Sequence, residues 1–149
     1  CFLIGRKLEL EFSQKVVKSA KSMGNVHIVG DTPAAQVKQY LAAADVFVLP
    51  SRDEALPISL IEAMAFGLAI IATRVGGVAE IIQDQVNGLL VEKEDPAGLA
   101  KCITNLYLDK DYRYNLGIAG KRSYQGSLTY DLFVERYHAV ICALQEPIG

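Results

Sequence analysis

Two glutamates eight positions apart, Glu54 and Glu62, are the residues of this chain best suited to chemistry. Pro57 lies between them and biases the residue before it away from helical angles, so the two glutamates cannot share one continuous helix face. We therefore expect Glu54 in a loop and Glu62 in the first or second turn of the helix that follows. Carboxylates so placed accept hydrogen bonds from hydroxyl groups, and the free amides at a helix start suit a phosphate. The pattern predicts a pocket for a nucleotide sugar.

The elements that must position these glutamates alternate along the chain, because short apolar runs are separated by stretches with helical periodicity. Such runs are typical of strands buried on both faces of a parallel sheet. We expect strands at 2–5, 26–29, 46–49, 69–73 and 89–91. We expect helices at 8–23, from the cap Thr32 and the first residue Pro33 to about 44, at 59–66, in a short turn ending at 82, and at 96–108, 112–123 and 129–144.

This alternation predicts an α/β fold with a Rossmann-like, doubly wound parallel sheet flanked by helices. In sheets of this kind, ligands bind beyond the carboxyl ends of the strands. Glu54 follows one predicted strand, and the paired glycines Gly76 and Gly77 follow the next. The fold therefore places the first glutamate and the glycine pair at the ligand-binding edge of the sheet.

Size and composition limit the function classes. A length of 149 residues predicts a single domain, 1–149, with a sizeable core. A net charge of −2 with 21% charged residues gives no basic field for nucleic acid. The most apolar window, 58–75, contains Glu62, Gly67 and Arg74, so it does not fit a membrane span of roughly 20 apolar residues. The three cysteines lack the spacing of a disulfide framework or a zinc site, which favours a cytoplasmic location.

The candidate site residues also have purely structural interpretations. Ser59 and Glu62 fit a capping box, in which Glu62 accepts from the amide of Ser59 and serves the helix alone. Glu54 fits a solvated loop charge. Gly76 and Gly77 fit a turn, since glycine adopts positive φ without any ligand.

Other polar residues favour structural roles. Asp109 and Asp111 have a D-x-D spacing that suits a metal ion, but they connect two helical segments rather than end a strand. His27 lies in a strand run and His138 on the last helix, where each fits packing better than catalysis. The side chain of Arg74 suits a phosphate by charge and length, but a surface role is favoured.

Several motifs in register resemble one family. The E-x7-E signature lies in VLPSRDEALPISLIEAMAFGLAIIAT, and VGGVAEII and NGLLVEKEDPAGLAKCI follow it in the order and spacing of that family. Upstream, NVHIVGD and VKQYLAAADVFVLPS are similar to the preceding strands and helix. The chain resembles the carboxy-terminal, donor-binding domain of a GT-B glycosyltransferase, in particular the retaining family 4 (group 1), and the resemblance covers most of its length.

The resemblance implies transfer of a sugar from a nucleotide diphosphate donor to a glycan or lipid-linked acceptor, with retained anomeric configuration. It implies that Glu62 holds the ribose hydroxyls and that Glu54 is the catalytic residue beside the transferred sugar. It implies further donor contacts through backbone amides and close backbone approach, at Leu56, Ile58, Ser59, Gly76 and Gly77. It implies no metal and no cofactor.

The chain also departs from the family pattern. Many relatives have EGFG at the first glutamate where this chain has EALP, and Pro57 has no amide hydrogen to donate. Arg6 and Lys7 have the residue types of the family's diphosphate-binding Arg/Lys loop. We reject that assignment, because the strand before them lies only about one helix before NVHIVG, which is the spacing of a later strand of the family. The chain also opens on FLIG without an initiator methionine or a signal-peptide pattern.

We therefore expect a piece of a longer protein that lacks both the Arg/Lys loop and the acceptor-binding amino-terminal domain. Such a piece should bind a donor weakly and be inactive alone, and the whole protein fits a peripheral association with the membrane. Two alternatives stay open: a non-catalytic α/β binding or scaffolding module, and another GT-B activity such as sugar epimerisation or phosphorolysis.

Overall fold

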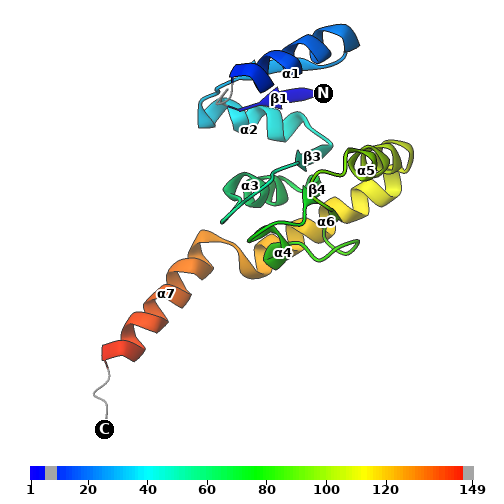
Figure 1. Ribbon diagram of the computed structural model, residues 1–149. Coiled ribbons are helices and arrows are strands. Elements are labelled where there is room, and N and C mark those ends of the chain that lie inside the picture. The colour runs from blue at the N-terminus through cyan, green and yellow to red at the C-terminus, as the bar shows by residue number, and fades with distance from the viewer. Residues whose placement is uncertain (6–9, 146–149) are drawn as a thin grey trace. The chain divides into compact units, whose positions relative to one another are not determined.

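The computed structural model describes residues 1–5 and 10–145, and its contacts divide the chain into two compact units, Cys1–Ala43 and Ala44–Gly149. Both units consist of parallel strands connected by helices, which confirms the predicted α/β class (Figure 1). Arg6 and Lys7 lie outside the described residues, as does the predicted start of the first helix. That the whole chain forms one domain stays a prediction.

The first unit has two strands and two helices. They are β1 (Phe2–Ile4), α1 (Leu10–Met23), β2 (His27–Gly30) and α2 (Ala34–Ala43). β1 and β2 pair in parallel, with Phe2 opposite His27 and the two rings stacked at a centroid distance of 5.3 Å. His27 therefore has the structural role that its strand position favours. The residues of β1 are exposed, unlike the prediction of burial on both faces, because a two-stranded sheet has too little apolar surface to enclose a core.

The predicted cap of α2 is wrong. The hydroxyl of Thr32 donates to the carbonyl oxygen of Gly30 at 3.1 Å, so it folds back on the strand instead of accepting from the helix. The carbonyl of Pro33 accepts from the amides of Gln36 and Val37 instead, and the helix begins one residue later, at Ala34.

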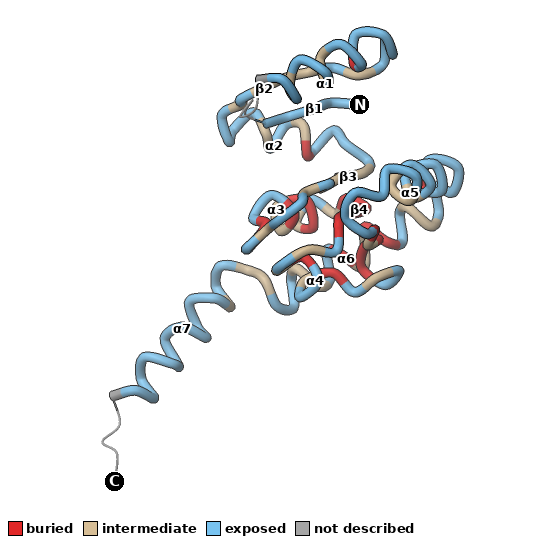
Figure 2. Tube along the Cα trace, viewed as in Figure 1, coloured by how far each residue is buried: buried red, intermediate tan, exposed pale blue. Residues whose placement is uncertain are grey.

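The second unit is built on a three-stranded parallel sheet in the order β3-β4-β5. Its elements are β3 (Val46–Leu49), α3 (Ile58–Phe66), β4 (Ala69–Thr73), α4 (Val78–Ile81), β5 (Leu89–Val91), α5 (Pro96–Leu108), α6 (Lys110–Ser127) and α7 (Tyr130–Gln145). The central strand β4 is buried at all its residues, as its uninterrupted apolar run predicts (Figure 2).

Helices cover both faces of this sheet. On one face, Ile71 belongs to a buried cluster with Leu106 of α5 and Leu116 of α6. On the other, α3 contacts β4, and Ile70 and Ile82, the C-cap residue of α4, both lie beside Gly88. Because consecutive β4 residues point to opposite faces, this strand packs against both layers, and this packing fixes the position of its carboxyl end.

Two aspartates set the helix boundaries after the sheet. Asp95 caps α5 by accepting from the amide of Gly98 at 2.9 Å, with Pro96 as first residue, as predicted. Asp109 caps α6 by accepting from the amide of Tyr112 at 2.8 Å, so its D-x-D spacing serves a helix start. Within the described ranges, no group of three or more His, Cys, Asp or Glu side chains has the arrangement of a metal site. In the same ranges, none of the helices has both the length and the apolar character to cross a bilayer.

Candidate functional site

The loop after β3 is tied to the end of β4 by a buried threonine. The hydroxyl of Thr73 lies 2.5 Å from the carbonyl oxygen of Ser51 and 3.3 Å from that of Leu49. The side chain of Thr73 is almost fully buried. Since a buried hydroxyl is costly to leave without a partner, these contacts fix the point at which the chain leaves the sheet.

Glu54 is held at two places. The hydroxyl of Ser51 donates to Oε1 of its carboxylate at 3.0 Å, and the amide of Gly77 donates to its main-chain carbonyl at 3.2 Å. The residue is half-buried. Glu54 is therefore a loop residue whose side chain and main chain are both hydrogen-bonded at the carboxyl edge of the sheet, and its interpretation as a partly solvated loop charge stays open.

The paired glycines pack against the backbone of this loop. Gly76 has φ +42°, and a Cβ there would overlap the carbonyl oxygen of Glu54. A Cβ on Gly77 would overlap the carbonyl oxygen of Ala55. Glycine is required at both positions by close approach of two backbones, in addition to the turn itself. Their predicted approach to a donor stays a prediction.

The start of α3 differs from the capping-box interpretation. The helix begins at Ile58, after Pro57, and no side chain caps it. Ser59 is consequently the second helical residue and not the cap, so Glu62 does not complete a capping box. The carbonyl of Pro57 accepts from the amides of Leu60 and Ile61 at 3.0 and 3.2 Å.

The amides predicted to face a donor are not equally available. The amide of Ile58 donates to the carbonyl of Leu56 at 3.0 Å, across Pro57. In the first turn, the amide of Ser59 has no hydrogen-bond acceptor among the described residues. Leu56 and Ile58 keep their side chains exposed, at 59% and 58%. The first turn of α3 therefore offers an exposed apolar surface beside one available amide.

Glu62 lies in the second turn of α3, as predicted. Its neighbours Leu60, Ala63 and Met64 are fully buried, whereas Glu62 itself is half-buried. No ion pair of the described residues includes Glu54 or Glu62. Glu62 thus lies on a helix that is packed into the core and Glu54 on a loop held by hydrogen bonds, and among the described residues no cationic side chain pairs with either carboxylate.

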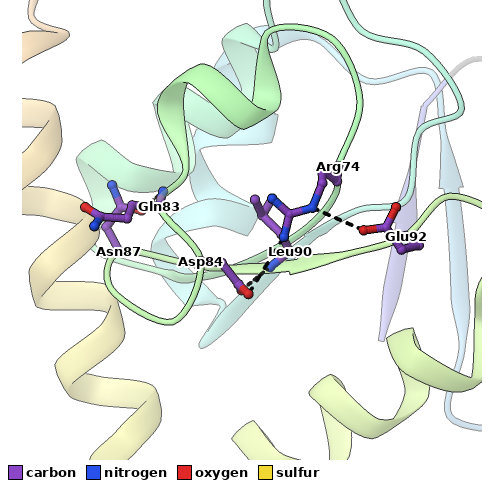
Figure 3. Close-up of polar contacts among 6 residues, drawn as sticks. All are labelled: Arg74, Gln83, Asp84, Asn87, Leu90 and Glu92. Carbon is purple, nitrogen blue, oxygen red and sulfur yellow. Dashed lines mark hydrogen bonds and ion pairs between the residues drawn. The ribbon is translucent and has the colours of Figure 1, made fainter.

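Arg74 connects the carboxyl ends of β4 and β5 (Figure 3). Its Nε lies 3.1 Å from Oε1 of Glu92, and its Nη2 lies 3.8 Å from Oδ2 of Asp84. Asp84 in turn accepts from the amide of Leu90 at 2.9 Å. These contacts confirm the surface role that the sequence favours for Arg74.

Two polar residues of the site region, Ser51 and Thr73, carry no motif of their own, and sequence reasoning missed their roles. They hold the Glu54 loop through hydrogen bonds, whereas Asn87 holds the turn before β5, at the other edge of the parallel sheet. The buried side chain of Asn87 accepts from the amide of Gln83 at 2.8 Å and donates to the hydroxyl of Ser123 at 3.1 Å. For Ser51, two residues after β3, and Thr73, the last residue of β4, the position at a strand end was the available signal, and the turn signal Asn87-Gly88 was available for Asn87.

Two other titratable groups belong to the core and not to the site. Burial, followed by the negative charge of Asp84, raises the pKa of the Cys102 thiol and of the Tyr112 phenol. Both side chains pack against the cluster around Ile71. Raised pKa values keep both groups protonated at neutral pH, which agrees with a packing role.

The family comparison agrees with this geometry. Residues 1–123 match the family described as glycosyl transferases group 1. An uncharacterized glycosyltransferase of Methanocaldococcus jannaschii is 35% identical over 77% of this chain and 32% of its own length. A D-inositol 3-phosphate glycosyltransferase of Arthrobacter is 34% identical over 88% of this chain and 32% of its own length. The chain belongs to the group 1 glycosyltransferase family, and it spans about a third of the length of these curated relatives.

Solved structures with the same fold are GT-B glycosyltransferases. HepE of Anabaena, solved in complex with UDP, superposes with a TM-score of 0.87 at 20% identity, covering 95% of this chain and 40% of that one. Sucrose-phosphate synthase of Thermosynechococcus elongatus gives a TM-score of 0.85 at 26% identity, covering 96% and 38%. The predicted GT-B, Rossmann-like fold is confirmed.

Proposed function

We propose that this chain is the donor-binding part of a glycosyltransferase that moves a hexosyl group from a nucleotide diphosphate sugar with retained anomeric configuration. The observation that carries the proposal is the hold on Glu54 at the carboxyl edge of β3, beside the start of α3, where Glu62 follows in the second turn. Ligands of parallel α/β sheets bind at this edge. Membership of the group 1 family supports the same donor class.

In this proposal each carboxylate has one partner. Glu62 accepts hydrogen bonds from the ribose hydroxyls, and Glu54 contacts the transferred sugar and stabilises positive character at its anomeric carbon. The available amide of Ser59 donates a hydrogen bond to the distal phosphate. Leu56 and Ile58 contribute apolar contact and no second hydrogen bond. Gly76 and Gly77 allow the backbone to approach the donor.

Cleavage of the bond between the sugar and the diphosphate is favoured by hydrogen-bond donors at this edge of the sheet. Cleavage of the sugar–oxygen bond leaves new negative charge on the nucleoside diphosphate, while the sugar becomes oxocarbenium-like. In other enzymes, removing one preorganised donor to a developing oxyanion costs about 3 kcal/mol. The amide of Ser59 and the positive end of α3 supply stabilisation of this kind, and we propose that no metal takes part.

The acceptor belongs to the remaining part of the protein in this proposal. The curated relatives are about three times as long as the segment they share with this chain. A glycan or lipid-linked acceptor, bound by an amino-terminal domain of a cytoplasmic or membrane-peripheral enzyme, fits the family. HepE, solved also with UDP-glucose, supports a nucleotide sugar as the class of donor to try first.

Calorimetric titration of the chain with UDP, GDP and ADP sugars tests the proposal. We expect one donor to bind and Glu62→Gln to weaken it about tenfold, because charged hydrogen bonds to the ribose are lost. Glu135→Gln on the exposed surface of α7 is the matched control and should bind like the unmodified chain. If a folded chain binds no nucleotide at millimolar concentration, and Glu62→Ala changes only the melting temperature, the non-catalytic module is the correct alternative.

A further inference from the structure

The carboxylate of Glu54 has one oxygen engaged by the protein. The hydroxyl of Ser51 donates to Oε1 at 3.0 Å, and the hydrogen bonds of the described residues include none to Oε2. A hydrogen bond to one oxygen of a carboxylate restricts its rotation and orients the other oxygen. The Ser51 hydroxyl therefore selects one orientation of the Glu54 side chain.

The group that holds Glu54 is itself held. The carbonyl of Ser51 accepts from the buried hydroxyl of Thr73, and the carbonyl of Glu54 accepts from the amide of Gly77. Both anchors come from the segment that ends β4, whereas Ser51 and Glu54 follow β3. The orientation of the carboxylate thus depends on two neighbouring strands of one sheet, so it is fixed before any ligand arrives.

We infer that Ser51 is a positioning residue: its hydroxyl holds the Glu54 carboxylate so that Oε2 meets the sugar of the donor. This inference rests on the proposed function, since it assigns Glu54 to the sugar. The hydroxyl touches neither nucleotide nor phosphate in this arrangement, and its effect passes through Glu54. Loss of the hydroxyl should weaken recognition of the sugar and leave recognition of the nucleotide unchanged.

A purely local role makes a different prediction. A serine that only shapes the turn between Ser51 and Glu54 would, on removal of its hydroxyl, disturb the loop as a whole and lower the affinity for nucleotide and nucleotide sugar alike. The anchor at the Ser51 carbonyl is main chain and survives a change of side chain. Ser51→Ala should consequently keep the loop in place and remove the carboxylate contact alone.

The experiment compares UDP with UDP-glucose, and likewise the GDP and ADP pairs, by calorimetry on the chain and its variants. For the pair that binds, we expect Ser51→Ala to leave the nucleotide affinity within about twofold and to weaken the nucleotide sugar about tenfold. Ser51→Thr, which keeps a hydroxyl at the same place, should restore most of the loss. The control Thr104→Ala removes an exposed hydroxyl that donates to the carbonyl of Ala100 within α5, and should change neither affinity.

A second comparison separates positioning from folding. In a Glu54→Ala background, Ser51→Ala should have no further effect on the nucleotide sugar, because the group it positions is gone. An equal loss for nucleotide and nucleotide sugar, or an undiminished effect in the Glu54→Ala background, would overturn the inference. Binding that depends on Glu62 but not on Ser51 would overturn it and leave the proposed function standing, whereas a folded chain that binds no nucleotide refutes both.

Discussion

Gly76 offers the sharpest test of how the site is built. Its φ of +42° lies in the left-handed region, where a residue with a side chain is disfavoured by about 1–2 kcal/mol. A Cβ would also overlap the carbonyl oxygen of Glu54, which the amide of Gly77 binds at 3.2 Å. Losing that hydrogen bond adds about 1 kcal/mol. Gly76→Ala should therefore lower the free energy of unfolding by about 2–3 kcal/mol.

A change of this size is measurable by thermal unfolding followed by circular dichroism. For a chain of this length it corresponds to a fall in melting temperature of about 4–12 °C. Gly126→Ala is the matched control, because Gly126 lies in α6 with open space around its Cα and no positive φ. That variant should be neutral or slightly stabilising. A Gly76→Ala chain as stable as the unmodified one would show that the glycine pair does not pack on the Glu54 loop as described.

Three further predictions concern the stability of the second unit. Asn87→Ala should lower the free energy of unfolding by about 2 kcal/mol, since it leaves the amide of Gln83 without its acceptor, and an unchanged urea midpoint would contradict this. Asp95→Ala should cost about 1 kcal/mol by the same assay, because α5 loses its cap, while Asp95→Asn should recover most of it. The raised pKa values of Cys102 and Tyr112 mean that the folded chain keeps protons that the unfolded chain releases from about pH 9, so stability should fall as pH rises above that value. Cys102→Ala should make this fall above about pH 9 shallower, and parallel curves for both chains would refute the assignment.

The sequence correctly predicted those helices and strands whose signals come from neighbouring residues. Asp95 and Pro96 form a cap and first residue that depend on a few neighbouring atoms, and α5 has the predicted bounds. The apolar run of β4 likewise predicted a central buried strand, and Pro57 correctly separated a loop glutamate from a helical one.

Local signals failed where two chemically similar arrangements compete. Ser59 and Glu62 have capping-box spacing, yet the helix begins one residue earlier, and Pro57 supplies its carbonyl in place of a side-chain cap. Thr32 is a good cap residue by type, but its hydroxyl turns to the carbonyl of Gly30. In both cases a backbone carbonyl accepts a hydrogen bond where the spacing suggests a side-chain cap.

Contacts distant in sequence could not be predicted. Gly76 and Gly77 meet the loop around Glu54 more than 20 residues earlier, so their need for glycine is visible only once β3 and β4 are side by side. The same holds for Thr73, which fixes the Ser51 carbonyl across the two strands. These contacts depend on strand register, which no single motif specifies.

The most direct measurement is a crystal structure of the chain with a bound nucleotide sugar. We expect the ribose hydroxyls to lie within hydrogen-bond distance of Glu62, at the carboxyl edge of β3, and the sugar ring to lie against the oxygen of Glu54 that Ser51 does not engage. A nucleotide bound elsewhere on the chain, or at this edge with its ribose away from Glu62, would contradict this expectation.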